Sequence, residues 1–429
     1  MWSAQAVSAF GSRITRTALP IIAVVTLGES ESMIGVLAAM QLMPGIAVAM
    51  MAGGLVDRGH KRRILIASDL IRAALVASLT CAWALHALSS MFHLIVVGAG
   101  VGAATALFQI TDVAYLPQLI GRRHLVEGNA KLETTEAIAE ITGPAATGAL
   151  VSALGAPLAV AIDAASYLWS AFMLGRIRGD ARPARPETPL PLALADEAAA
   201  ASDAAVVVRT GRDFRIGVRA VFGHPQVRPI ILTLMMWSIT GGFFISLYTP
   251  FCLRELGLSE RAFGVIIAMG GVGSLGGAIV ARGLANRIGV GRTMIATATL
   301  SLLFTLFIPI AAYAPSRALT FAFLALHQLG GDGFSVAFVI LAVTLRQSVL
   351  PRDVLGRANA AVHVSTTGAL VVSAVLAGVL ASLVGIRAAV WAGMLIGLCA
   401  PLLLWPLRRL RDMPSNDLSG GALHKAGRP

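Results

Sequence analysis

Long apolar stretches, separated by short polar segments, follow one another along the whole chain. Each is close to the roughly 20 residues that a helix needs to cross the hydrocarbon core of a bilayer. Glycine and proline recur inside them, which spanning helices tolerate because neighbouring helices satisfy the freed backbone groups. The pattern predicts an all-α membrane protein with twelve transmembrane helices, at 4–27, 33–55, 64–86, 92–116, 133–153, 157–177, 226–252, 261–284, 293–314, 318–345, 358–384 and 387–407.

The composition and the placement of charge agree with a protein embedded in a lipid bilayer. Of the 429 residues, 56% are hydrophobic and 13% charged, about half the charged share of a soluble domain. The net charge of +12 comes mostly from lysines and arginines in alternate loops and in the tail. This asymmetry follows the positive-inside rule. It places both termini in the cytoplasm, predicts the inner membrane of a bacterium, and argues against nucleic acid as a partner.

No cluster of residues suggests a cofactor, a metal ion or an enzyme. The three cysteines, Cys81, Cys252 and Cys399, are far apart in the sequence, and none has the spacing of a metal ligand. The chain contains neither an ATP-binding P-loop motif nor an added soluble domain. We therefore expect a protein that binds a small molecule without catalysing a reaction.

A polar segment divides the hydrophobic pattern into two halves. Residues 178–225 are rich in proline, arginine and alanine, which is typical of a flexible connection. Their last part, 212–222, is expected to form a basic amphipathic helix on the membrane surface. The predicted organisation is a six-helix bundle at 1–177, a cytoplasmic linker at 178–225, a second six-helix bundle at 226–407 and a cytoplasmic tail at 408–429.

The two halves share short sequence matches at a constant offset. Arg63 after the second stretch matches Arg292 after the eighth, 229 residues later. Gln118 after the fourth stretch matches Gln347 after the tenth, again 229 residues later. Two separate loops with one offset indicate parallel six-helix repeats, an arrangement found in transporters.

One loop carries a recognisable motif. The segment Gly53-Gly54-Leu55-Val56-Asp57-Arg58-Gly59-His60-Lys61-Arg62-Arg63 resembles the signature loop of the major facilitator superfamily, with His60 where glycine is usual. The acid would act at a helix N-terminus or pair with cations. Gly143-Pro144 with Gly148 resembles the antiporter pattern of the fifth helix, although Thr147 stands where glycine is common. The resemblance implies a conformational gate that includes Gly53, Asp57, Arg58, Lys61, Arg62, Gly143 and Pro144.

Further stretches are similar to one branch of that superfamily. Ser68-Asp69-Leu70-Ile71-Arg72-Ala73 and Leu116-Pro117-Gln118-Leu119 resemble enterobactin exporters and macrolide-efflux proteins. This resemblance implies a monomeric antiporter that uses protons to export a drug, an antibiotic or a siderophore-like metabolite, and a role in antibiotic or multidrug resistance. The alternative is an importer or uniporter of a sugar or an organic acid on the same fold.

Ionisable residues inside spanning helices are costly and are therefore functional candidates. Asp332 lies in the middle of the tenth stretch, one helical turn after Gln328. A partly dehydrated carboxyl group there could exchange a proton, or it could simply bond to a neighbouring helix. Gln109 and Asp112 form a polar stripe on the fourth stretch. The family resemblance implies that this stretch lines a central cavity; alternatively, Asp112 pairs with an arginine near the inner face.

The first and fifth stretches contain further charges. Arg16 could extend towards the cytoplasmic surface, pair with Asp112, or contact an anionic substrate. Glu140 lies deeper in its stretch than Glu136 and is predicted to carry a proton or to form a salt-bridge gate. Asp163 is expected to be solvated or to cap a helix near the outer surface.

Three aromatic residues share one face of the seventh stretch. Trp237, Phe244 and Tyr248 either pack against other helices or face a cavity, where they would suit a large apolar ligand. We therefore take Arg16, Gln109, Gln328 and these aromatics as candidates for the substrate cavity, with Asp332, Asp112 and Glu140 as candidates for proton coupling.

Overall fold

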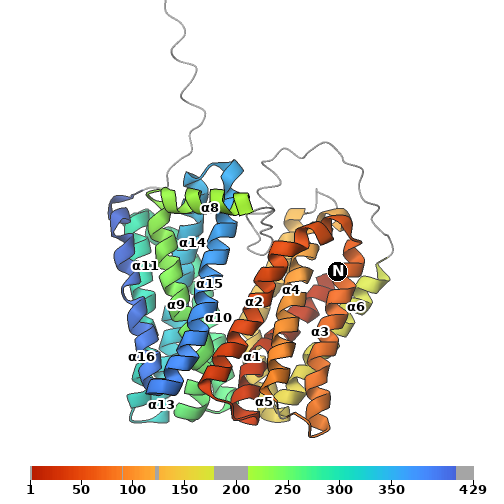
Figure 1. Cartoon of the computed structure of the whole chain (residues 1–429). Helices are drawn as coiled ribbons and strands as arrows, with labels where there is room; N and C mark the ends of the chain where they lie inside the picture. Colours follow the sequence, from red (N-terminus) through yellow and green to blue (C-terminus); the bar gives the residue numbers. More distant parts are fainter. Residues whose placement is uncertain (1, 89, 121–124, 178–210, 412–429) are drawn as a thin grey trace, which may run out of the picture.

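The protein is an assembly of long helices (Figure 1). The computed structural model describes residues 2–88, 90–120, 125–177 and 211–411. Side chains are not described at 49–55, 57–58, 118, 125–127, 129–130, 133, 211–213 and 352–353. The predicted linker therefore lies largely outside the described residues, as does the tail after residue 411.

The N-terminal half contains six long helical segments. The first, α1, continues into the π-helical turn η1, so that helical structure runs unbroken through residues 2–26. The bounds are α1 Trp2–Ile21, η1 Ile22–Thr26, α2 Glu31–Arg58, α3 Lys61–Ala84, α4 Met91–Ile120, α5 Leu125–Leu154 and α6 Ala156–Arg176.

The C-terminal half repeats this arrangement after one additional helix, α8. Several of its spans are built from more than one helical piece. The bounds are α8 Gly211–Gly223, α9 Val227–Pro250, η3 Phe251–Glu255, α10 Glu260–Ile288, α11 Val290–Thr305, α12 Phe307–Ile310, η4 Ala311–Tyr313, α13 Arg317–Leu326, η5 His327–Gly331, α14 Asp332–Val349, α15 Arg352–Val384, α16 Ile386–Gly397 and η6 Ala400–Arg409.

Eleven of the predicted spans are confirmed as helices long and apolar enough to cross a membrane. The remaining stretch, 4–27, forms α1 and η1. Its arginines Arg13 and Arg16 and several hydroxyl-bearing residues lower its apolar character. It packs beside α5 and α6 of its own half. The first helix therefore belongs to the bundle although its composition alone does not identify it as a span.

The two halves share an unusual backbone feature at the same 229-residue offset. Leu27 N donates to Ile22 O over 3.0 Å, and Leu256 N donates to Phe251 O over 2.9 Å. Each π-turn is followed by a left-handed glycine, Gly28 with φ +69° and Gly257 with φ +62°. Such φ values suit glycine because it has no Cβ. The repeat seen in the sequence therefore extends to the backbone conformation.

The halves contact each other mainly at the end of the bundles opposite α8, which we call the far end. There α2 packs on α15, and α5 packs on α10 (Figure 1). Gly35 of α2 lies against the carbonyl of Ala374, and Gly148 of α5 lies against Gly264 of α10. Small residues of this kind let helix backbones approach closely inside a membrane.

Helix α8 runs across the end of the C-terminal bundle (Figure 1). The predicted helix at 212–222 is confirmed, with bounds Gly211–Gly223. Val221 is buried in a cluster that includes Val227 and Leu350, and Gly217 lies directly against the carbonyl of Arg357. One face of α8 is therefore held by the bundle. We call this side of the protein the α8 end.

The close α5–α10 contact gives a test of the packing between halves. A Cβ at Gly148 would lie 2.8 Å from both Glu260 O and Gly264 Cα, whereas nothing lies within 4 Å of a Cβ at Gly276 of α10. Both Gly→Ala changes favour the helix by about 1 kcal/mol, but overpacking costs about 1–3 kcal/mol. We expect Gly148→Ala to be less stable than the control Gly276→Ala by about that overpacking cost in thermal unfolding in detergent. Equal stability of the two variants would contradict the close contact.

Candidate functional site

Asp332 lies in the middle of the tenth span, where the helix is locally widened. The π-turn η5 joins α13 to α14, and such turns occur often at functional sites. The turn leaves Asp332 at the start of α14 with its carboxylate against Gly270 of α10. A side chain at Gly270 would overlap Asp332 Oδ2. Within the described part of the chain, no ion pair involves Asp332.

A buried amide and an aromatic group surround Asp332. Gln328 is 2% exposed, and its Oε1 lies 3.4 Å from the Cβ position of Gly270, the same position that Asp332 touches. The predicted common face of Gln328 and Asp332 therefore exists. His327 packs against Phe244, with ring centres 5.8 Å apart, and Phe244 stacks on Tyr248 at 4.3 Å.

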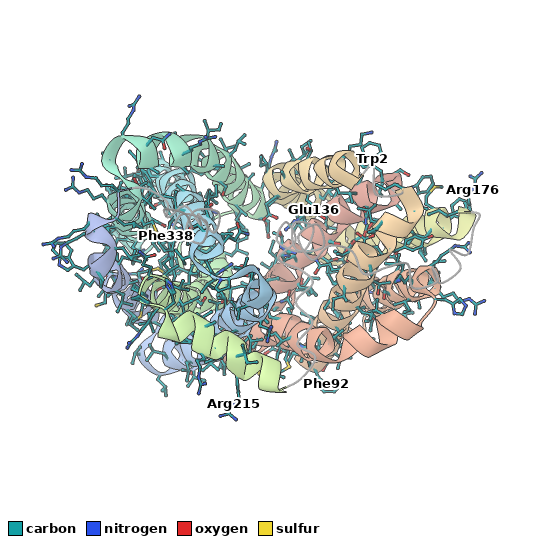
Figure 2. All side chains as sticks on the ribbon, turned by 90° about the horizontal axis from the view of Figure 1, so that it is seen from above. Trp2, Phe92, Glu136, Arg176, Arg215 and Phe338 are labelled. Atoms are coloured by element: carbon teal, nitrogen blue, oxygen red, sulfur yellow. The ribbon has the colours of Figure 1, made fainter. Side chains whose placement is uncertain are left out.

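The predicted aromatic stripe on α9 divides into two parts. Trp237 packs at 5.0 Å against the fully buried Phe338 of α14, which lies within the C-terminal half (Figure 2). Tyr248 is 4% exposed and belongs to the main core, whereas Phe244 is only partly buried. Trp237 and Phe244 both keep some accessible surface, and Phe244 is the one that contacts His327, next to Gln328.

Charged residues of α1 and α5 form a second group, which we call the Arg13 cluster: Arg13, Glu136 and Glu140. Arg13 Nη2 lies 2.8 Å from Glu136 Oε2, and Nη1 pairs with Glu140. The Arg13 side chain is 14% exposed, but those of Glu136 and Glu140 are 53% and 56% exposed. Seen from the α8 end, Glu136 lies near the boundary between the halves (Figure 2). The sequence analysis identified Glu140 but not Arg13 as its partner.

The helix that carries Glu140 and the helix that carries Asp332 both pack against α10 where α10 has two glycines in succession. The residue after Glu140, Ile141, places its backbone against the Cβ position of Gly271, while the adjacent Gly270 meets Asp332. Two successive glycines thus separate α5 of one half from α14 of the other. At this contact the helix that carries Glu140 and the helix that carries Asp332 meet the same two glycines.

Arg16, Gln109 and Asp112 lie in the N-terminal half. Arg16 and Gln109 are exposed, and Asp112 is partly buried. No ion pair between Arg16 and Asp112 occurs among the residues that the structure describes. Asp112 instead has the side chain of Gln5 from α1 beside it. Arg16 feels the charges of Glu136 and Glu140, which places it at the edge of the Arg13 cluster.

The signature loop is only partly described. Gly53, Asp57 and Arg58 fall in the last turns of α2, but their side chains lie outside the described residues. Lys61 is the first residue of α3. Arg62 donates from Nε to Leu174 O over 2.9 Å and from Nη2 to Gly175 O. Arg62 therefore joins the start of α3 to the end of α6 within one half.

Gly143 and Pro144 place α5 between two neighbours. A Cβ at Gly143 would lie 2.7 Å from Arg13 Cβ on α1, whereas the carbonyl of Pro144 lies against Gly264 of α10. Thr147 is fully buried and donates to Gly143 O over 2.8 Å. The predicted antiporter-like segment therefore lies where its own bundle meets the other one.

Buried charges inside the N-terminal bundle were not expected. Asp163 is 0% exposed, so its predicted solvated or capping role is wrong; α6 points it into the bundle, towards α1. Asp69 and Arg72 of α3 form an ion pair and are 0% and 3% exposed. Their i, i+3 spacing, which brings opposite charges together on a helix, was the available sequence signal.

An arginine joins the halves at the far end. Arg254 of η3 donates to Val24 O over 2.7 Å and to Glu29 O over 2.5 Å, and its guanidinium lies 3.8 Å from the Glu31 carboxylate. All three acceptors belong to the N-terminal half. Within the described residues, no group of three or more His, Cys, Asp or Glu side chains could hold a metal ion.

Comparison with known proteins gives the family. Residues 1–362 match the Major Facilitator Superfamily. A search of curated proteins found no match. The structure is similar to a bacterial homologue of human lysosomal Spinster in an inward-facing, unoccupied conformation (16% identity, TM-score 0.69, 95% of this chain and 96% of the other).

It is also similar to a bacterial homologue of the iron transporter ferroportin. The inward-facing state gives a TM-score of 0.68 at 16% identity, with 95% of this chain and 97% of the other covered. The outward-facing state gives 0.53 at 16% identity, with 94% and 98% covered. The similarity is therefore greater to the inward-facing state of that relative.

The Arg254 contacts predict a shift in conformation. Glutamine at position 254 can keep at most one of the two hydrogen bonds that hold the far end closed, and the loss of one hydrogen bond costs about 1 kcal/mol net. We expect the population open at the far end to rise about five-fold. Spin labels at Ser30 and Ser382 should report it as a larger share of long distances. Arg387→Gln is the matched control, because Arg387 pairs with Glu255 inside the C-terminal half. An equal response of both variants would contradict the prediction.

Proposed function

This chain belongs to the Major Facilitator Superfamily and is a membrane transporter of that kind, and we propose that it exports a small organic compound in exchange for protons. The observation that carries the proposal is Asp332, an acid at mid-span that has no ion-pair partner among the described residues. An unpaired carboxyl group at that depth is costly when charged. It is therefore suited to taking up a proton in one state and releasing it in another.

The path of the proton involves both halves. Asp332 belongs to the C-terminal half, and the Arg13 cluster belongs to the N-terminal half. Glu140 and Asp332 would both be negative when ionised, and their helices are separated by the two glycines of α10. Movement of α5 against α10 changes the repulsion between these charges, so that protonation of Asp332 depends on the relative position of the halves. Glu140, held by Arg13, is the acid that senses this movement, and Asp112 is a further candidate in α4.

The orientation follows from the basic residues. The α8 end carries most of the lysines and arginines of the described loops, and by the positive-inside rule we assign it to the cytoplasm. The two halves are closed at the far end by Arg254 and the α2–α15 contact. This conformation is therefore inward-facing in our proposal, an assignment supported by the greater similarity to the inward-facing relative. Alternating access would open the far end and close the α8 end around the signature loop.

The substrate class follows from the groups near Asp332. Phe244 has accessible aromatic surface, Gln328 supplies an amide, and Asp332 supplies a carboxyl group. On the other half, Arg16 and Gln109 are exposed. A mostly apolar compound with a few polar groups fits this combination. Drugs, antibiotics and siderophore-like metabolites are such compounds, so efflux and resistance are the expected biological readouts.

The rival function is import or uniport of a sugar or an organic acid. The fold operates in either direction, so the direction of transport must be measured. Uptake of substrate by intact cells would favour this rival, whereas resistance or secretion would favour export.

Asp332 gives the direct test of proton coupling. A compound panel screened by thermal stabilisation of the purified protein identifies a ligand, which is then loaded with the protein into liposomes. We expect an imposed pH gradient to drive its transport by the wild type. In Asp332→Asn, which cannot exchange a proton, gradient-driven transport should fall at least ten-fold while ligand-induced stabilisation persists.

The matched control is Ser335→Ala on the same helix, which removes a polar group without removing a charge. It should retain gradient-driven transport. Wild-type transport that is indifferent to the pH gradient would refute proton coupling altogether. Normal coupled transport by Asp332→Asn would remove Asp332 from the mechanism while leaving coupling in place.

A further inference from the structure

Three charged side chains lie inside the N-terminal bundle, away from the boundary between the halves. We call Asp69, Arg72 and Asp163 the buried triad. Their residues are 0%, 3% and 0% exposed. Asp69 and Arg72 come from α3 and Asp163 from α6, two helices in close contact. None of these residues belongs to the groups around Asp332 or Arg13.

Aromatic rings and small residues seal the buried triad from water. The Arg72 guanidinium lies 4.5 Å from the ring centre of Phe108 on α4 and 4.3 Å from that of Tyr167 on α6. On the other side, a Cβ at Gly11 of α1 would overlap Asp163 Oδ1. The cation is therefore covered by two π faces, a favourable arrangement in a dry site.

The charges of the buried triad do not balance. Asp69 pairs with Arg72, which leaves Asp163 as a second carboxylate beside a single cation. Asp163 Oδ1 accepts from Ser166 Oγ over 3.0 Å, but Oδ2 is buried and makes no hydrogen bond. The hydroxyl groups of Thr15 and Tyr167 lie close to Asp163, but Thr15 Oγ1, like Asp163 Oδ2, makes no hydrogen bond. A buried charge without a partner neutralises itself rather than remaining ionised.

The remaining charged groups nearby do not supply the missing cation. From α1, Arg13 is engaged by Glu136 and Glu140 of α5, and Arg16 lies exposed at the edge of that cluster. From α4, Asp112 adds negative charge near Asp69. The hydroxyl group of Tyr167 on α6 forms a hydrogen bond with the hydroxyl group of Ser12 on α1 over 3.0 Å. The surroundings therefore favour a neutral triad.

The other half shows that the fold does not require these charges. The helices α3 and α11 begin at Lys61 and Val290, 229 residues apart, and α6 and α16 begin at Ala156 and Ile386, 230 apart. At these offsets, Asp69, Arg72 and Asp163 correspond to Ala298, Ser301 and Gly393.

Those C-terminal positions are packed without charges. Ala298 is fully buried, Ser301 Oγ donates to Gly331 O over 2.8 Å, and Gly393 lies against the ring of Phe243. Replacing buried ion pairs with well-packed neutral residues is often neutral or stabilising. The N-terminal half therefore keeps a costly arrangement that its structural repeat does without.

We propose that the buried triad is a proton-binding site of the N-terminal half, in which Asp163 holds a proton while Arg72 balances the Asp69 carboxylate. The proton would leave when α1 moves off Asp163 and admits water. Because α1 also carries Arg13 and Arg16, such a movement links the site to the charged groups at the boundary of the halves. This role in transport rests on the proposed function, whereas the presence of the proton does not.

Infrared spectroscopy of the purified full-length protein tests the proton directly. A protonated carboxyl group has a carbonyl stretch that ionised carboxylates lack, and it shifts in heavy water. We expect such a band in the wild type at neutral pH and its loss in both Asp163→Asn and Asp69→Asn. Either substitution leaves a single carboxyl group in the triad, and Arg72 can balance its charge, so that this group no longer needs a proton. If one variant does not fold, the other carries the test.

Two controls separate this inference from the proposed function. Asp332→Asn should keep the band of the buried triad, and Ser301→Ala, at the symmetry-related position of Arg72, should leave the whole carboxyl region unchanged. A band that persists at full intensity in both Asp163→Asn and Asp69→Asn would overturn the proposal. A band lost in these variants together with normal coupled transport by Asp332→Asn would refute Asp332 as the coupling acid and leave the triad standing.

Discussion

The cost of an ionised side chain where water is scarce shapes the arrangement of charge in this protein. A charge inside a bilayer must find a partner, reach water or lose its ionisation. Arg13 has found partners in Glu136 and Glu140. Arg254 bonds to carbonyls of the opposite half. Asp332 and Asp163 have no ion-pair partner among the described residues, which is why we propose proton exchange for both.

The membrane also explains why glycine is so frequent at the contacts between helices. Helices within a membrane gain little from burying apolar surface against each other, so they associate through close packing. Gly148 and Gly264 let the two halves touch, and Gly270 leaves room for the Asp332 carboxylate. At Gly11 the missing side chain admits Asp163 and Ser166. Glycines therefore allow the two halves to pack closely, and they leave the space that the side chains of Asp332 and Asp163 occupy.

The two halves share a backbone plan and differ in chemistry. The π-turns η1 and η3 and the left-handed glycines that follow them are equivalent, so the plan is repeated even where the sequence has diverged. Only the N-terminal half holds Asp69, Arg72 and Asp163 between its third and sixth spans, and only the C-terminal half places an acid directly after a π-turn in its fourth span. A repeated fold can therefore carry a different ionisable group in each copy.

The apolar stretches and their lengths predicted the helices. A bilayer requires spans of about 20 residues, and their backbone polar groups must bond within the helix. The 229-residue offset and the Asp57–Arg58 loop determined the repeat and the family. The sequence also identified Asp332, since a mid-span acid is conspicuous in any apolar stretch. It did not reveal Arg13 as the partner of Glu140 or the burial of Asp163, and it left open whether Trp237 packs on another helix. Those depend on which face of each helix meets another helix, and only the packing of the whole bundle decides that.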